Sequence, residues 1–266
     1  MRFFSHQIRL FFIALQFFTR WPVPAWVGFE PAWLQQCARY FPVVGTVVGG
    51  VAALVLWVAS WIWSPAVAVG LSLAASVVLT GGFHEDGWAD TCDGLGGAVS
   101  REKALLIMKD SRIGSYGALG LVLMLGLKAA CLIALLESDP MLALWATVWA
   151  HTASRAAPVA LMHALPYAGD AEHAKAKPLA TQANGATLSV ALAWVLLLSG
   201  AVAWLAPREV PLLCAGWVAA GGATLAMQAW LEMRLGGYTG DNLGATQQVT
   251  ELVSLLSFAA LINYSG

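Results

Sequence analysis

The sequence predicts an all-α integral membrane protein, a polytopic bundle of about seven transmembrane helices preceded by an interfacial amphipathic helix. The composition supports this class, because 59% of the 266 residues are hydrophobic, 11% are charged and the mean hydropathy is +0.70. A soluble domain of this size could not cover so much apolar surface. Apolar segments also recur along the chain, each near the ~20 residues that a helix needs to cross a bilayer.

The first 40 residues are predicted to form an interfacial segment. Polar side chains recur on one helical stripe and apolar side chains on the opposite one. The polar stripe holds Ser5, Arg9, Gln16 and Arg20, and the apolar stripe holds Phe4, Ile8, Phe11, Phe12, Leu15 and Phe18. This pattern is typical of a helix that lies on the membrane rather than crossing it. The apolar run at 10–15 is too short, and lacks the cleavage pattern, expected of a signal peptide.

Seven apolar segments follow and are expected to form one membrane-embedded domain, residues 1–266. They lie at about 43–63, 66–83, 117–137, 141–162, 187–206, 211–231 and 244–262. The last is the least apolar, because Gln247, Gln248, Thr250 and Glu251 occupy its first half. Inside a bundle, we expect these polar groups to turn inward.

Basic residues between these segments are strongly biased to one side. That side holds Arg2, Arg9, Arg20, Arg39, Arg101, Lys103, Lys109, Arg112, Lys175, Lys177 and Arg234, whereas the other holds Arg208. Because positive charges favour the cytoplasmic face, the N-terminus and the long polar loops are predicted to be cytoplasmic. The expected location is a bacterial-type inner membrane, with the active site on its cytoplasmic side.

The net charge and the cysteine content bear on which partners and which cell compartment fit the chain. The net charge of −1 gives no indication of a nucleic-acid partner. The four cysteines include no Cys-x-x-Cys pair and do not indicate an oxidising compartment. The apolar composition instead indicates the lipid bilayer as a partner.

The stretch from Gly81 to Gly97 combines four acids with six glycines in a chain otherwise poor in charge. Asp86, Asp90 and Asp93 stand at i, i+4 and i+7, so they share one face if the segment is helical. Like charges on one face repel unless a cation lies between them, and Mg²⁺ takes such oxygen ligands together with substrate phosphates. We therefore predict a metal–phosphate site within a cytoplasmic acidic, catalytic loop at 84–116. The alternative is a solvated acidic loop.

A second polar element, residues 108–117, supplies Lys109, Ser111 and Arg112 beside glycines. Cations and hydroxyls next to glycine-rich backbone suit a phosphate or pyrophosphate. The same residues also fit a positively charged anchor at the start of a transmembrane segment. The two interpretations are compatible.

Two basic residues lie inside predicted transmembrane segments. A buried guanidinium is costly unless it is paired or faces a cavity, so Arg155 is predicted to face a site. His151, one turn earlier, fits either the core or the site, and Lys128 has no assigned role. The connector flanked by His163 and His173 is interpreted as a linker or a lid.

The third polar element, residues 236–245, carries Asp241 after three glycines. A helix cap alone would explain Asp241. A cap does not require Tyr238, Thr239 and Asn242 as well, so we favour a second acidic contribution to the site.

Six motifs occur in order along nearly the whole chain. They are Thr19-Arg20-x-Pro22-x-Pro24, Phe41-Pro42-x-Val44-Gly45, His84-Glu85-Asp86-Gly87-x-Ala89-Asp90-Thr91-x-Asp93-Gly94, Lys109-Asp110-Ser111-Arg112-x-Gly114, Ser154-Arg155 and Gly240-Asp241-x-x-Gly244-Ala245. With these motifs the chain resembles the adenosylcobinamide-GDP ribazoletransferase family, the cobalamin (5′-phosphate) synthases. Trp88 departs from the smaller apolar residue common at that position, which affects packing rather than chemistry.

The resemblance implies a Mg²⁺-dependent transferase. The ribose 3′-hydroxyl of α-ribazole, or of its 5′-phosphate, attacks the cobinamide-linked phosphorus of adenosylcobinamide-GDP, and GMP leaves. Such chemistry asks the protein mainly for positioning and charge stabilisation. Other corrinoid-assembly enzymes and further copies of the chain are candidate partners.

The resemblance also implies roles for individual residues. Asp86, Asp90 and Asp93 would bind one or two Mg²⁺ ions, with Glu85 or Asp241 completing the ligand set and one carboxylate taking the hydroxyl proton. Phosphate and substrate contacts are expected from His84, Lys109, Ser111, Arg112, Arg155, Tyr238, Asp241 and Arg20. A hydrogen bond from His84 to a carboxylate is the alternative for that residue.

Two other functions fit parts of the sequence. A transporter of divalent cations or corrinoids would also use intramembrane basic residues and an acidic cluster. The acids lie at the predicted cytoplasmic edge and no inverted repeat is visible, which favours the transferase. A structural subunit of a corrinoid-assembly complex would leave the row of carboxylates unexplained.

Overall fold

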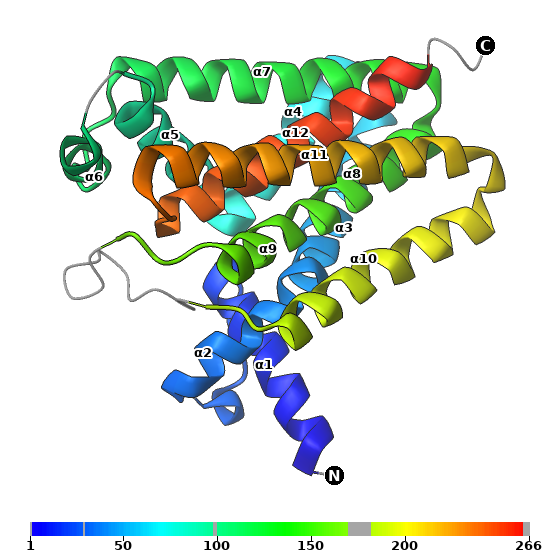
Figure 1. Ribbon diagram of the computed structural model, residues 1–266. Helices are drawn as coiled ribbons and strands as arrows, with labels where there is room; N and C mark the ends of the chain where they lie inside the picture. Colours follow the sequence, from blue (N-terminus) through cyan, green and yellow to red (C-terminus); the bar gives the residue numbers. More distant parts are fainter. Residues whose placement is uncertain (1, 29, 98–99, 170–181, 263–266) are drawn as a thin grey trace.

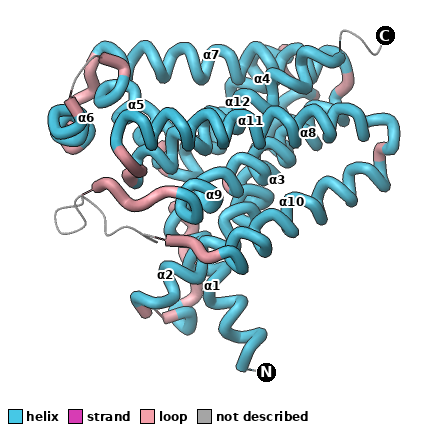
Figure 2. The backbone as a smooth tube through the Cα atoms, viewed as in Figure 1, coloured by secondary structure: helices cyan, strands magenta, loops and turns pink. Residues whose placement is uncertain are grey.

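The computed structural model describes residues 2–28, 30–97, 100–169 and 182–262. Within them the chain is a bundle of twelve α-helices, and Figure 2 shows that short loops join most of them. The helices are α1 (Arg2–Phe18), α2 (Pro31–Cys37), α3 (Phe41–Ser60), α4 (Pro65–Thr80), α5 (Phe83–Leu95), α6 (Arg101–Met108), α7 (Ser115–Ser138), α8 (Pro140–Ser154), α9 (Ala156–Ala164), α10 (Gly185–Leu205), α11 (Val210–Leu235) and α12 (Gly240–Ile262). The all-α membrane fold class is thereby confirmed.

The count of seven transmembrane helices is not confirmed. Among the described residues, five helices are long and apolar enough to cross a membrane: Ala32–Ser60, Ser115–Ser138, Gly185–Leu205, Pro207–Leu235 and Gly240–Ile262. A sixth is obtained if α4 and α5, which meet at 90°, form one bent span. The predicted segment 141–162 is divided between α8 and α9, which separate at Arg155.

The bend between α4 and α5 has a local cause. Gly81 and Gly82 both have positive φ, 71° and 72°, a conformation that favours glycine. The Gly82 N–H donates to the carbonyl of Val77 at 2.9 Å, which satisfies the end of α4 before α5 begins at Phe83. The predicted segment 66–83 therefore ends early, and the acidic motif starts a new helix.

Residues 84–116, expected as a loop, are largely helical. Helix α5 carries the acidic motif and packs against α7 and α12, and α6 follows it. Figure 1 shows α5 and α6 at one end of the bundle, beside the connection between α11 and α12. Most of the connector that follows His163 lies outside the described residues.

Helix α12 lies at the centre of the bundle and contacts α5, α7, α8, α9 and α11. Gln247, Gln248, Thr250 and Glu251 are all buried, as expected for polar groups turned inward. The least apolar of the predicted segments is thus the one that the other helices surround.

The N-terminal helix α1 packs on α2 and α3. Leu15 and Phe18, predicted on the lipid-facing stripe, are buried in the protein, whereas Phe4 and Ile8 are exposed. On the opposite stripe, the Arg9 guanidinium lies 5.6 Å from the centre of the Trp33 ring. The C-terminal part of the apolar stripe therefore packs inside the protein, whereas its N-terminal part lies on an exposed tip, which projects from the bundle in Figure 1.

Candidate functional site

Helix α5 places the three aspartates as the spacing predicts, since residues at i, i+4 and i+7 of one α-helix share a face. Asp86 is exposed, and Asp90 and Asp93 are half-buried. His84 lies in the interior instead, 3% exposed and stacked on Phe18 with ring centres 5.3 Å apart. The acids thus occupy the open side of α5, whereas the histidine packs against α1.

A glycine contact joins α5 to α12. A Cβ atom added at Gly87 would lie 2.7 Å from the Asp241 carbonyl oxygen, and one added at Gly244 would lie 3.4 Å from the His84 Cα. The two backbones can approach this closely because neither glycine carries a side chain. The crossing brings Asp241 beside the acidic motif, although 155 positions separate Asp86 from it in sequence.

The start of α12 is held by its own polar residues. The Asn242 side chain accepts the Thr239 N–H at 2.9 Å and donates to Thr91 of α5 at 3.0 Å. These contacts cap α12 and bind it to the middle of α5. The cap is therefore built around Thr239 and Asn242, which leaves open the acidic contribution expected from Asp241.

Asp93 has a contact that the sequence did not indicate. Its two carboxylate oxygens accept the N–H groups of Gly114 and Gly117, each at 2.7 Å. Gly114 is the N-cap residue of α7 and Gly117 lies in its first turn, where N–H donors lack partners within the helix. Asp93 therefore caps α7 and holds the segment 109–114 against α5.

The exposed cations of that segment lie near this junction in sequence. Arg112 forms a fork with Asp110, with Nη2 and Oδ2 2.6 Å apart, and its side chain is 87% exposed. Ser111 and Lys109 are also exposed. These groups are accessible to an anionic ligand approaching the acidic end of the bundle.

Arg20 and Tyr238, both predicted to contact substrate, lie in different parts of the structure. The Arg20 guanidinium lies against Gly81, at the bend that starts α5, and its backbone N–H donates to the Leu79 carbonyl at 2.9 Å. Tyr238 is fully buried, and burial together with the neighbouring Tyr167 raises its pKa well above the usual value. Its phenol stays neutral, its ring lies edge-on to that of Tyr167, and its backbone forms a short bridge with the same residue.

Arg155 is 2% exposed and its partners lie in the interior. It donates to the His151 carbonyl at 3.0 Å and lies 3.2 Å from His151 Nδ1, and Glu251 and Glu85 attract it electrostatically. No described residue accepts a hydrogen bond from its Nε atom. Arg155 is therefore buried and held by His151, and the expectation that it faces a phosphate site stays a prediction.

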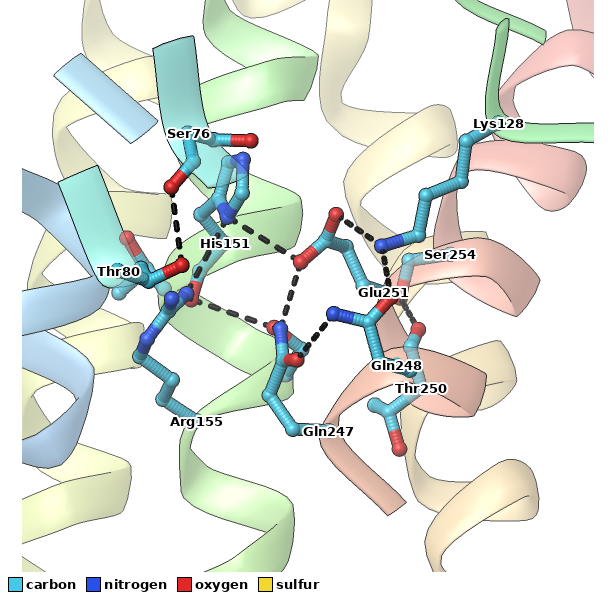
Figure 3. A network of polar contacts seen from close by, with 12 residues as sticks. Ser76, Thr80, Lys128, His151, Arg155, Gln247, Gln248, Thr250, Glu251 and Ser254 are labelled. Carbon is cyan, nitrogen blue, oxygen red and sulfur yellow. Dashed lines mark hydrogen bonds and ion pairs between the residues drawn. The ribbon is translucent and has the colours of Figure 1, made fainter. Parts of the chain in front are cut away.

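Sequence reasoning missed the buried network that Figure 3 shows around Glu251. Lys128 Nζ of α7 donates to Glu251 Oε1 at 2.6 Å and to Gln248 Oε1 at 2.7 Å. Glu251 Oε2 accepts from Gln247 at 2.6 Å and lies 3.1 Å from His151 Nδ1. An acid and a base in two predicted transmembrane segments were the available signal, since buried charges are normally paired.

The donor set of α5 fits a hard cation shared with a ligand. Within the described part of the chain, no three acidic, histidine or cysteine side chains converge into a complete metal site. Two aspartates on one face, with Asp241 beside the same helix, nonetheless supply the oxygens that Mg²⁺ takes when phosphates provide the rest. The metal assignment stays a prediction.

Comparisons with a family model and with known proteins point to the same enzyme family. The family model described as cobalamin-5-phosphate synthase matches residues 10–259. An adenosylcobinamide-GDP ribazoletransferase of Leptothrix cholodnii is 61% identical over 255 residues, which cover 96% of both chains. The enzyme of that name from Shewanella piezotolerans is 43% identical and also covers 96% of both. No solved structure matches the chain. The chain therefore belongs to the cobalamin-5-phosphate synthase family.

Proposed function

We propose that this protein joins adenosylcobinamide-GDP to α-ribazole, or to its 5′-phosphate, and releases GMP. Membership of the family makes it a transferase of cobalamin synthesis. The finer statement rests on one structural observation: α5 presents a row of carboxylates beside Asp241, and Asp93 holds the cation-bearing segment 109–114 against the same helix. Acids and cations thus meet at one end of the bundle, as a pyrophosphate substrate with a divalent cation requires.

The acids divide into two roles in this proposal. Asp86 and Asp90, with Asp241, would hold Mg²⁺, which when bound neutralises phosphate charge and orients the leaving group. Asp93 belongs to the predicted ligand set, but both of its oxygens already accept backbone N–H groups. We therefore assign it chiefly to holding the segment 109–114 in place.

In this proposal, the cationic side chains bind the substrate phosphates. Lys109 and Arg112 are exposed, and the planar fork of Arg112 can exchange Asp110 for a phosphate of similar geometry. Arg155 stays a predicted phosphate contact, and its burial requires the substrate to reach the interior of the bundle. In the transfer, the ribose hydroxyl gives its proton to a carboxylate of the site and its oxygen forms the new bond to phosphorus. The bond from that phosphorus to the bridging oxygen breaks, and GMP leaves with that oxygen and the bonding pair.

The location is part of the proposal. The bias of the basic residues supports a cytoplasmic position, at an inner membrane, for the α5 end of the bundle. Cysteine labelling of single-cysteine variants in sealed vesicles, at Ser111 and at Arg208, tests this orientation. Labelling of the first from the cytoplasmic side and of the second from the opposite side is expected, and the reverse pattern contradicts it.

GMP release by the detergent-purified protein tests the function. The assay supplies adenosylcobinamide-GDP with and without α-ribazole, in Mg²⁺ and in EDTA. GMP formation that requires both the acceptor and the metal is expected. GMP without acceptor would identify a hydrolase instead, and no GMP from a folded, lipid-replenished sample would refute the proposal.

A further inference from the structure

The network around Glu251 reaches helix α5 through one hydrogen bond. Gln248 Nε2 of α12 donates to Glu85 Oε1 at 3.1 Å and to Gln247 Oε1 at 3.0 Å. Glu85 directly precedes Asp86 in the acidic motif. The interior of the bundle is thus connected to the first acid of the proposed site.

The direction of every hydrogen bond along this path is determined by its ends. A lysine ammonium donates only, so the Gln248 atom facing Lys128 at 2.7 Å is the oxygen, and its Nε2 must point to Glu85. A carboxylate accepts, so the Gln247 atom that contacts Glu251 Oε2 at 2.6 Å is the nitrogen. A flipped amide at either position would set two donors or two acceptors against each other.

The charges of this cluster are balanced. Lys128 and Arg155 are buried cations, and Glu251 and Glu85 are the carboxylates that face them. A buried ionic cluster is tolerated when its charges are paired and hydrogen-bonded. The arrangement around Glu85 is therefore held by several polar contacts rather than by one side chain.

One carboxylate oxygen of the cluster has no hydrogen-bond donor among the described residues. Glu85 Oε2 is inaccessible to solvent, and no described residue donates a hydrogen bond to it. An acceptor buried without a donor is unfavourable, so its retention calls for a donor supplied from elsewhere. Gln248 holds the other oxygen, which restricts rotation of the carboxylate.

We propose that Glu85 Oε2 accepts a hydrogen bond from the attacking ribose hydroxyl of the acceptor substrate, and that Gln248 and Lys128 are positioning residues for it. The proposal rests on the proposed function. The attacking hydroxyl carries a proton that Oε2 can accept in a hydrogen bond, and the same contact would orient the hydroxyl oxygen for attack. In this arrangement Glu85 would contact the acceptor nucleoside, and the aspartates proposed to hold Mg²⁺ would serve the pyrophosphate.

The test compares two ligands that differ in one group. Dissociation constants are measured for α-ribazole and for its 3′-deoxy analogue, with detergent-purified full-length protein in Mg²⁺. In the wild type, α-ribazole should bind about 10- to 100-fold more tightly, the range for a hydrogen bond to a charged group. In Glu85→Ala this ratio should fall to about one, and in Gln248→Leu at least fivefold below wild type, because the carboxylate is no longer held.

Thr250→Val is the matched control. Thr250 lies on the same helix, is buried, and its hydroxyl has no hydrogen-bond partner among the described residues. The ratio should stay at the wild-type value there. Should Glu85→Ala or Gln248→Leu fail to fold, Glu85→Gln and the unbranched Gln248→Met take their places, each with a lowered ratio expected.

A ratio in the Glu85 variants equal to wild type overturns the inference. The GMP assay with wild-type protein separates this outcome from failure of the proposed function. Acceptor-dependent GMP release together with an unchanged ratio refutes the role of Glu85 alone. Absence of acceptor-dependent GMP release refutes both.

Discussion

Removing Lys128 should destabilise the protein strongly, because it leaves Glu251 buried without its main cation. The two side chains are 2% and 4% exposed, and Nζ lies 2.6 Å from Oε1. Breaking a buried ion pair by deleting one partner typically costs ~3–5 kcal/mol. Gln247 and His151 remain next to the other carboxylate oxygen, so we expect Lys128→Met to cost about 3 kcal/mol, the lower end of this range.

Thermal unfolding of the detergent-solubilised protein measures this effect. A loss of about 3 kcal/mol corresponds to a melting temperature lower by roughly 6–12 °C for a chain of this size. Lys103→Met, at an exposed position of α6, is the matched control and should change stability by less than about 0.5 kcal/mol. The double variant Lys128→Met/Glu251→Gln should recover more than half of the loss, because no isolated charge stays buried.

The reasoning fails if Lys128→Met costs less than about 1 kcal/mol, below what an unpaired buried charge requires. It fails equally if the double variant is as unstable as the single one. In either case, the contacts in Figure 3 would be a consequence of helix packing rather than a contribution to it.

Three further predictions follow from the site. Asp93→Asn should release one of the N–H groups of Gly114 and Gly117, at a cost of about 1–2 kcal/mol, and speed hydrogen exchange at one of the two amides; unchanged exchange at both would contradict the capping role. Gly87→Ala should separate α5 from α12, cost about 1–3 kcal/mol and reduce GMP release, whereas Gly50→Ala, with open space around its Cβ, should not; equal effects would argue against the close crossing. Chelation by EDTA should abolish GMP release while leaving the melting temperature within about 3 °C, since a cation shared with substrate contributes little without it; a large fall would indicate a structural metal.

Much of the site could be predicted because its signal is local. The helical spacing of Asp86, Asp90 and Asp93 requires one helix and nothing else, so a sequence pattern is sufficient to predict their shared face. The inward orientation of Gln247, Gln248 and Glu251 was predictable for a similar reason, since polar groups in an apolar segment avoid lipid. The seven-helix count is not confirmed where a local break interrupts a predicted segment: two positive-φ glycines follow α4, and α8 ends at Ser154.

The sequence by itself determined the membrane class, the helical character and the row of acids on α5, because composition and periodicity depend on neighbours within one or two turns. Tertiary structure alone decided which distant groups meet. Asp93 caps α7, Gly87 admits Asp241, and Glu251 joins Lys128 to His151. Each of these contacts joins helices that are not consecutive in the chain. Their packing depends on a missing side chain or a paired charge, which the sequence of one segment does not reveal.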